Sequence, residues 1–478
     1  MNSKERSLKM YFRRFFDEKL AQNSYLVGCQ QTGEAIVLDP ARHIESYIKA
    51  AEDEGVEIVA AAETHIHADF VSGARELAHR LNVTLYMSNE GDKDWKYHYL
   101  NDVEHQLLQA GDVFYIGKVK FDVLYTPGHT PESLSYLLTD EGSGAERPMG
   151  IFTGDFVFVG DVGRPDLLEK TSQTTGTTAA GARDMFQSLQ RFKELPDYLQ
   201  LWPGHGAGSA CGKSLGAVPT STTGYEKLNN WALLEEDEET FVQELIAEQP
   251  APPKYFAVMK QVNKVGPSLL NDEPLDEVNE LETLEKEINN PDVQVVDTRV
   301  ETDFSERHLP GTVNIPYRKS FPNWAGWLLD YEKDILIIAS MREVDFIKQA
   351  LESIGLDRLF AFASPDLIQH AENVEQYKVE NPETVQEQFE KNKMEVIDVR
   401  NQDEWDAGHI PDATHIMLGY LPDRLAEVPQ DKPVAVHCRT GKRSAIAASI
   451  LQKNGFKNVV NIEGGFENWK NKDLPTKK

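Results

Sequence analysis

Positive charge is scarce in this chain of 478 residues. Its 49 lysine and arginine residues stand against 78 aspartate and glutamate residues, which gives a formal net charge of −29 at pH 7. A surface this acidic repels phosphate backbones and anionic lipid headgroups. The composition therefore argues against nucleic acid and against membrane as partners.

Long apolar runs and cysteines are scarce as well. No apolar stretch approaches the length of a membrane span, and the N-terminal residues MNSKERSLKMYFRRF have no apolar core of the kind that a signal peptide needs, so we expect a cytoplasmic protein. The three cysteines are an odd number, and a reducing compartment disfavours disulfides between Cys29, Cys211 and Cys438. Cys29, inside the apolar run YLVGC, is expected in the core.

The length predicts about three domains, because a single core rarely grows to this size. YFRRFFDEKLAQNSYLVGC and EAIVLDPA are typical of strands, HIESYIKAAEDEG of a helix, and VEIVAAA of the next strand. This first domain continues to about residue 265, where the proline-containing stretches EQPAPPKYF and KVGPSLLNDEPLDE mark its exit.

Two later segments repeat each other: VQVVDTRVETDFSERHLPGTVNIP at 293–316 and MEVIDVRNQDEWDAGHIPDATHIM at 394–417. The matched pairs are Asp297 with Asp398, Arg299 with Arg400, His308 with His409, and Pro310 with Pro411. Each copy continues into a second apolar strand, DILIIA or KPVAVHC, and then a helical pattern, which predicts two small α/β domains with mainly parallel sheets. We expect domains at residues 10–265, 286–375 and 378–478, with a linker at 266–285.

Side chains that bind metals follow several strands of the first domain. The motifs H-x-H-x-D, G-H-T, G-D and G-H supply, in this order, His65, His67, Asp69, His129, Asp155 and His205. Loops at one end of a β-sandwich can converge on a point, and so many ligand types at strand ends are hard to explain by packing. His205 alone would fit an ordinary surface loop, but the ordered set predicts a metal site.

The stretch AVHCRTGKRSAIAA in the last domain predicts a reactive cysteine. A strand ends at Cys438 and a helix begins near Ser444, so backbone N–H groups and a helix N-terminus face the sulfur. Arg439, Lys442 and Arg443 add positive charge. Such surroundings stabilise a thiolate or a terminal persulfide anion, whereas the alternative, an inert buried cysteine, rarely lies among so many cations.

Residues 10–265 resemble the metallo-β-lactamase superfamily, and within it the glyoxalase II and persulfide dioxygenase branch. The resemblance rests on the four metal motifs, and it implies an αββα sandwich with the metal at one end of its two sheets. Zinc hydrolases of this branch bind two metals and use a histidine directly after H-x-H-x-D, where this chain has Phe70. A complete second metal site is therefore not expected.

Persulfide dioxygenases of the same branch hold one ferrous ion with two histidines and one aspartate. By motif these are His65, His129 and Asp155, so the resemblance implies one Fe(II) per chain, with zinc as the alternative. Two imidazoles and a carboxylate on one face of iron leave positions open for a substrate sulfur and O2. The remaining motif residues would orient the ligands without binding the metal; they are His67, Asp69 and His205.

The loop from Cys438 to Ser444 resembles the active loop C-R-x-G-x-R-S of rhodanese sulfurtransferases, which implies catalytic roles for Cys438, Arg439 and Arg443. Its ring is one residue tighter than that of tyrosine phosphatases and suits sulfur better than phosphate. The middle copy reads LIIASMREVDF, with Ala339 nearest the cysteine position. We expect no sulfur transfer there, and the domain would serve packing, oligomer contacts or substrate walls.

Nearly the full chain thus resembles bacterial fusions of a persulfide dioxygenase with an inactive and an active rhodanese domain, of the CstB type. The implied fold class is α/β and α+β multidomain, an αββα metallo-β-lactamase sandwich followed by two rhodanese-like α/β domains. The implied reaction oxidises a persulfide of coenzyme A, bacillithiol or glutathione with O2 to sulfite and thiol, and the rhodanese cysteine turns sulfite into thiosulfate. Fusion keeps both partners at high effective concentration. This interpretation predicts sulfide detoxification by a homo-oligomer, either a dimer or a tetramer.

Three further residues are candidates for substrate binding. Cys211, in GSACGK, matches a cysteine that these fusions also carry near the iron pocket; it either accepts a persulfide sulfur or packs in its Gly/Ser loop. Arg164 and Lys213 either grip an anionic carrier thiol or form structural ion pairs. Two rival functions stay open: a glyoxalase II-like zinc thioester hydrolase, which needs no rhodanese loop, and a sulfide-responsive sulfur-carrier module with a structural metal.

Overall fold

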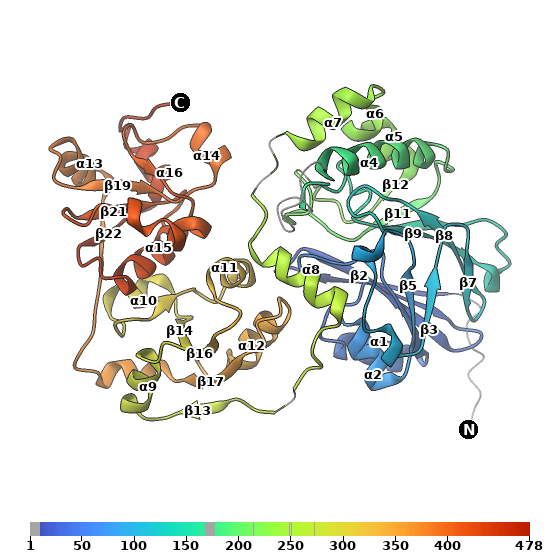
Figure 1. The fold of residues 1–478 in the computed structure, drawn as a ribbon, viewed down its shortest axis with the longest axis horizontal. Helices are drawn as coiled ribbons and strands as arrows, with labels where there is room; N and C mark the ends of the chain where they lie inside the picture. Colours follow the sequence, from blue (N-terminus) through green and yellow to red (C-terminus); the bar gives the residue numbers. More distant parts are fainter. Residues whose placement is uncertain (1–9, 168–176, 214, 248, 250, 272) are drawn as a thin grey trace. The chain divides into compact units, whose positions relative to one another are not determined.

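The computed structural model describes residues 10–167, 177–213, 215–247, 249, 251–271 and 273–478. The chain forms two compact units, the first made of residues up to Asn271 together with Glu352–Gly355, the second of the remainder (Figure 1). Within the described ranges, no helix combines the length and the hydropathy that crossing a bilayer requires.

The first unit contains two six-stranded sheets, in the orders β1-β2-β3-β4-β5-β6 and β12-β11-β10-β9-β8-β7. The first sheet consists of β1 Tyr11–Asp17, β2 Gln22–Cys29, β3 Glu34–Leu38, β4 Glu57–Ala62, β5 Thr84–Ser88 and β6 His105–Leu108. The second consists of β7 Val113–Ile116, β8 Val119–Tyr125, β9 Leu134–Asp140, β10 Gly150–Gly154, β11 Gln200–Pro203 and β12 Ser221–Thr222.

Helices cover the outer faces of both sheets, and the layers run α, β, β, α (Figure 1). The helices of this unit in the described ranges are α1 Glu45–Glu54, α2 Ala74–Leu81, α4 Thr177–Lys193, α5 Thr223–Asn229, α6 Trp231–Leu234, α7 Glu238–Ile246 and α8 Tyr255–Val265. Leu77 of α2 packs in one apolar cluster with Leu85 of β5, and Met185 of α4 packs in another with Leu201 of β11. The expected αββα sandwich is confirmed.

Two of the strands that precede the metal motifs, β4 and β10, are largely buried and have parallel neighbours. β4 pairs in parallel with β3 and β5, and β10 with β11. The small side chains of EIVAAA let β4 be covered on both faces, since Ala60, Ala61 and Ala62 are all fully buried. Loops that follow such strands leave the sheet at one edge, which is where the metal motifs lie.

The second unit contains two parallel five-stranded sheets with the same topology, β13-β17-β16-β14-β15 and β18-β22-β21-β19-β20. The first consists of β13 Asp276–Val278, β14 Val293–Asp297, β15 Val313–Asn314, β16 Asp334–Ile338 and β17 Leu359–Ala363, with α9 Leu281–Ile288, α10 Glu301–Glu306, α11 Phe321–Leu328 and α12 Val344–Glu352. The second consists of β18 Lys378–Glu380, β19 Glu395–Asp398, β20 Thr414–His415, β21 Val434–His437 and β22 Val459–Ile462, with α13 Pro382–Glu390, α14 Gln402–Asp406, α15 Lys442–Lys453 and α16 Gly465–Asn471. The predicted repeat of two rhodanese-like domains is confirmed.

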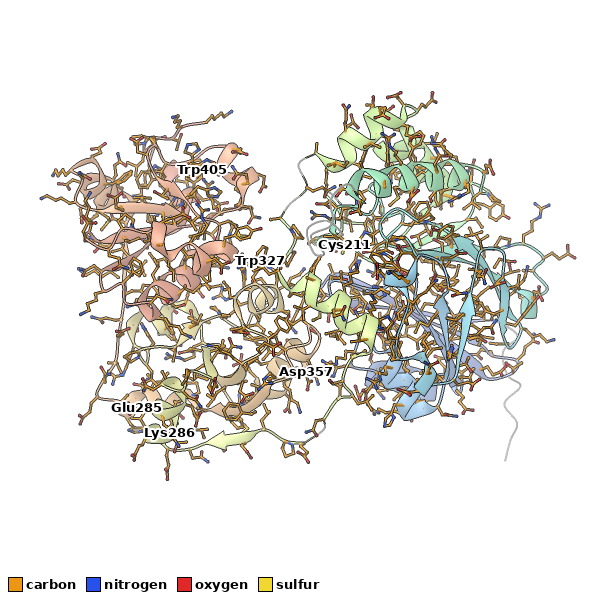
Figure 2. All side chains as sticks on the ribbon, viewed as in Figure 1. Cys211, Glu285, Lys286, Trp327, Asp357 and Trp405 are labelled. Carbon is orange, nitrogen blue, oxygen red and sulfur yellow. The ribbon has the colours of Figure 1, made fainter. Side chains whose placement is uncertain are left out.

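The repeat extends to individual contacts. The guanidinium of Arg299 pairs with Asp297, and that of Arg400 pairs with Asp398. A histidine ring stacks on the aromatic ring four residues before it in both copies, with ring centroids 3.8 Å apart in the first copy and 3.7 Å apart in the second, where the aromatic residue is Trp405 (Figure 2). These shared contacts do not involve the sulfur loop, so both copies retain them.

The expected linker at 266–285 is too long. β13 pairs in parallel with β17, and Leu284 of α9 is fully buried in the core of the middle domain. The middle domain therefore begins near Asp276 and not at residue 286. The short strand DEV has no alternation of apolar and polar residues that would mark it in the sequence. Its place in the sheet depends on its pairing with β17.

Candidate functional site

The structure brings three predicted metal-binding side chains together. His65 follows β4, His129 follows β8 and Asp155 follows β10, and their ligand atoms all lie within 4.8 Å of one another. Oδ2 of Asp155 is 3.9 Å from Nε2 of His65 and 3.6 Å from Nε2 of His129. In the described part of the chain, this oxygen and Nε2 of His65 have no hydrogen-bond partner. Buried polar atoms without partners are costly unless another group binds them, so the donor set fits a metal ion.

Hydrogen bonds on the opposite ring nitrogens select the tautomers that a metal needs. Nδ1 of His129 lies 2.9 Å from the carbonyl oxygen of Arg164, which can only accept, so this nitrogen carries the proton. Nδ1 of His65 lies 2.9 Å from Oγ1 of Thr64. The Thr64 hydroxyl donates its own proton to Asp39, 3.0 Å away, and therefore accepts from His65. Both Nε2 atoms keep a free lone pair.

Asp39 is a residue of this site that the metal motifs did not reveal. It directly follows β3 in a left-handed backbone conformation, with φ of 48°. Its carboxylate accepts the backbone N–H of Thr64 at 2.7 Å and lies 3.2 Å from Nε2 of His67. Burial alone would lower the pKa of His67, but Asp39 raises it to about 9. His67 is therefore paired with Asp39 as an imidazolium. The sequence signal that could have revealed Asp39 is a carboxylate directly after an apolar strand, in VLDP.

Glu132, three residues after His129, was also missed. Its Oε1 accepts the backbone N–H of Ile66 at 2.7 Å, and burial raises the pKa of Glu132 to about 7. The side chain thereby joins the loop that carries His129 to the loop that carries His65. No spacing rule in the sequence marks a contact of this kind.

Replacing Thr64 with valine is expected to weaken metal binding about 10–100-fold, because the change removes the acceptor that orients His65. Competition with a chelator of known affinity measures the effect. Thr223→Val is the matched control, since Thr223 is equally buried and its hydroxyl donates to the carbonyl of Pro196. Equal metal affinities in the two variants would contradict the role given to Thr64.

His205 lies between two carboxylates. Its Nδ1 is 2.7 Å from Oδ1 of Asp155, and its Nε2 is 2.7 Å from Oδ2 of Asp69. Burial alone would lower the pKa of His205, but Asp155 and Asp69 raise it well above the ordinary value. Nδ1 thus forms a hydrogen bond with Oδ1 of Asp155, whereas Nε2 lies at ion-pair distance from Asp69 and has no hydrogen-bond partner among the described residues.

Phe70 and Cys211 lie beside this pair. The ring of Phe70 is 1% exposed, and its centroid lies 4.4 Å from that of His67. Cys211 (Figure 2) forms a second buried group with Asp69 and His205, whose donor atoms lie within 4.8 Å of one another. Burial raises the pKa of the Cys211 thiol well above its ordinary value. Phe70 supplies no donor atom, so this second group lacks the histidine that would complete a second metal site.

Arg164 and Lys213, the candidates for gripping an anionic carrier, are both engaged by groups of the first unit. The guanidinium of Arg164 is fully buried and donates two hydrogen bonds of 2.7 Å to the carboxylate of Asp166. Nζ of Lys213 donates to the carbonyl oxygen of Glu244. These contacts favour a structural role over binding of an anionic carrier thiol, above all for Arg164.

The sulfur loop of the last domain surrounds Cys438 closely. Sγ of Cys438, a residue 1% exposed, lies 3.5 Å from Oγ of Ser444, and α15 begins at Lys442, two residues earlier than the sequence suggested. The carbonyl oxygen of Cys438 accepts the N–H of Phe466 at 2.8 Å, at the start of α16. Gly465, with φ of 58°, allows this approach, because a Cβ there would overlap that same carbonyl oxygen.

Two of the three loop cations are paired with carboxylates. Arg443 donates hydrogen bonds of 2.6 and 2.7 Å to Glu404 of α14, a partner that the sequence analysis missed. Arg439 is exposed and donates a bond of 2.6 Å to Glu467. Glu404 thus fixes Arg443, while Arg439 lies toward solvent.

The middle copy has no comparable sulfur site. Ala339 is buried after β16, and Oγ of Ser340, in the next position, donates to Glu343 at 2.6 Å. This described segment offers neither a thiol nor a ring of cations, and the absence of sulfur transfer in the middle copy stays a prediction.

Known families match each part of the chain. The metallo-beta-lactamase superfamily profile matches residues 17–205, and the rhodanese-like domain profile matches residues 280–360 and 381–472. The crystal structure of a metallo-beta-lactamase from Staphylococcus aureus subsp. aureus COL is 47% identical with a TM-score of 0.68, over 74% of this chain and 99% of that one. A hydroxyacylglutathione hydrolase of Synechococcus sp. is 32% identical over 180 residues, which are 38% of this chain and 62% of that protein. A sulfurtransferase of Allochromatium vinosum is 36% identical over 80 residues, which are 17% of this chain and 75% of that protein.

The buried cluster of histidine and aspartate at the edge of an αββα sandwich is the metal-binding site typical of this superfamily. The parallel sheet that carries Cys438 agrees with the second family. The chain therefore belongs to the metallo-beta-lactamase superfamily, and two rhodanese-like domains follow its metal-binding domain.

Proposed function

We propose that the first domain oxidises low-molecular-weight thiol persulfides with O2 at a single Fe(II), and that Cys438 converts the sulfite product into thiosulfate. In the first reaction one persulfide, one O2 and one water give the thiol, sulfite and two protons. In the second, the outer sulfur of a Cys438 persulfide moves to sulfite, and the electron pair of the broken S–S bond stays on the cysteine thiolate. The observation that carries the proposal is the buried Phe70 beside a donor set for one metal.

The residues of the first domain have separable roles in this proposal. His65, His129 and Asp155 would hold the iron, which when bound supplies sites for the substrate sulfur and for O2. Thr64 and the carbonyl of Arg164 orient the two imidazoles. Asp39 would orient Thr64 and His67 through its contacts with the Thr64 hydroxyl and the His67 ring. His205 would orient Asp155 through the hydrogen bond between them.

Cys438 would be the nucleophile of the sulfurtransferase. Ser444 reaches its sulfur, and Arg443 lies close enough that the sulfur and Glu404 both act on its guanidinium. Persulfides of the coenzyme A, bacillithiol or glutathione type are the proposed sulfur donors to both sites. The sulfurtransferase relative supports this assignment of the last domain.

A zinc-dependent thioester hydrolase is the second candidate for the first domain, because the hydroxyacylglutathione hydrolase relative matches this part of the chain. The second buried group of Asp69, His205 and Cys211 would have to hold the additional metal. The ring of Phe70, which lies beside His205 and supplies no donor atom, argues against that role.

Metal content and oxygen uptake distinguish the two candidates. Protein purified anaerobically without added metal is expected to contain one iron per chain and to consume O2 when glutathione persulfide is added. Sulfite should appear in step with the oxygen consumed. Two zinc ions per chain, with hydrolysis of a glutathione thioester and no oxygen uptake, would overturn the dioxygenase proposal in favour of the hydrolase.

A further inference from the structure

The helix that begins at the sulfur loop is buried on all sides. Residues 444–451 of α15 are buried without interruption, although such helices usually expose one face. One side of α15 packs on β21 and β22 of its own sheet, and another packs on β15 of the middle domain. The Ala- and Ser-rich sequence SAIAAS permits this double contact, since small side chains let other elements approach closely.

A hydrogen bond joins the two rhodanese-like domains at this helix. The backbone N–H of Asn314, in β15, donates to Oγ of Ser449 at 3.0 Å, and both residues are fully buried. The side-chain amide of Asn314 is itself held by the carbonyl oxygens of Asp297 and Arg299 at 2.9 Å. The middle domain thus presents a rigid edge to the helix.

A close contact between these domains lies at Trp327 of α11 (Figure 2), a residue 5% exposed. Its indole ring covers Gly419, where a Cβ would overlap the ring, and meets the ring of Tyr420 edge-on at a centroid distance of 5.3 Å. Elsewhere the same interface is looser, because a cavity of about 140 Å³ separates Leu329 from Ile450. Trp327 is therefore a point at which the middle domain lies against its neighbour without spare room.

Two backbone hydrogen bonds connect this point to the nucleophile. Gly419 directly follows Leu418, whose N–H donates to the carbonyl of Val399 at 3.2 Å. The N–H of Val399 donates in turn to the carbonyl of His437 at 2.9 Å. His437 directly precedes Cys438, so these two bonds link the backbone next to Gly419 to the strand end that carries the sulfur.

We infer that the cysteine-less domain positions the sulfur loop of its neighbour, and that Trp327 is the positioning residue. This role rests on the proposed sulfurtransferase function of Cys438. The middle domain has lost its own chemistry but keeps the scaffold contacts of its family, and it uses them to hold α15 and the segment around Gly419. Trp327 acts through these backbone contacts and has no assigned contact with sulfur.

A double-mutant cycle tests the inference in the full-length protein. Gly419→Ala is expected to lower kcat for thiosulfate:cyanide sulfur transfer about tenfold with little change in KM, because the new methyl group displaces the loop without removing any of its charged side chains. The alkylation rate of Cys438 by iodoacetamide should fall in parallel. In a protein that already carries Trp327→Leu, adding Gly419→Ala should lower kcat by less than about twofold. The smaller leucine side chain leaves room for the new methyl group.

Four comparisons keep the outcomes distinct. Thr298→Val is the control for general destabilisation, because the Thr298 hydroxyl donates to Ile338 inside the middle domain; it is expected to lower Tm without slowing Cys438 alkylation. The positioning role would be overturned if Gly419→Ala lowered kcat equally in the wild-type and the Trp327→Leu backgrounds. It would also be overturned if Gly419→Ala lowered Tm and left kcat unchanged. If Gly419→Ala does not fold, Trp327→Leu alone must still lower kcat about threefold, or the inference fails. A wild-type protein without sulfur transfer would instead refute the proposed function.

Discussion

Replacing Cys438 with serine is expected to lower sulfur transfer from thiosulfate to cyanide by at least about 1,000-fold, as removal of a catalytic nucleophile does. A hydroxyl group cannot carry the sulfane sulfur, and the described residues of the middle copy offer no thiol in its place. Oxygen uptake with glutathione persulfide should continue, because the proposed metal ligands are all in the first domain. The product should change from thiosulfate to sulfite, which ion chromatography measures.

Cys29→Ser is the matched control for this variant. Cys29 is another buried thiol, whose sulfur accepts the backbone N–H of Lys118 at 3.2 Å, and it has no assigned part in either reaction. Both activities should survive in the control. If Cys438→Ser abolished oxygen uptake itself, sulfur would have to pass from the rhodanese cysteine to the iron site, opposite to the order proposed here.

Replacing His65 with alanine should remove iron and oxygen uptake together. Loss of one ligand of three weakens metal binding far more than the ~10–100-fold expected for an orienting partner, so the purified variant should contain almost no iron. Sulfur transfer from thiosulfate to cyanide should remain, since the Cys438 loop needs no metal. Iron content by mass spectrometry and the two activities are measured on the same preparation.

His105→Ala controls for the loss of a histidine in the same domain. His105 is half-buried on β6, and its Nδ1 lies 3.0 Å from the carbonyl of Val103, away from the metal motifs. The control should keep its iron. A His65→Ala protein that retained a full complement of iron would show that the metal lies elsewhere.

The order of domains was predictable because each has a strong local pattern. Alternating and continuous apolar runs marked the strands of the sandwich, and the repeat around Arg299 and Arg400 marked two copies of one fold, which the shared strand order confirms. The metal motifs each follow a strand, so their convergence followed from the fold. The spacing of a motif identified site residues wherever the groups that act together are also close in the sequence.

Contacts between distant segments were not predictable. Asp39 and Thr64 are 25 residues apart, and Glu404 is 39 residues from Arg443, so no spacing rule connects them. The same limit explains Arg164: the sequence shows a cation near the motifs, but its burial against Asp166 depends on the folded loop. Partners across a sheet edge are selected by tertiary structure, which a single sequence does not display.

The left-handed backbone at Asp39 limits how far this position can vary. Glycine, asparagine and aspartate adopt such a conformation readily, but only aspartate also supplies the two carboxylate oxygens that Thr64 and His67 use. Glutamate retains the charge and strains the backbone, whereas glycine relaxes the backbone and leaves both partners without an acceptor. In a saturation library screened for retained iron, Asp39 should therefore show a mutational tolerance close to that of the metal ligands themselves, with asparagine as the best survivor.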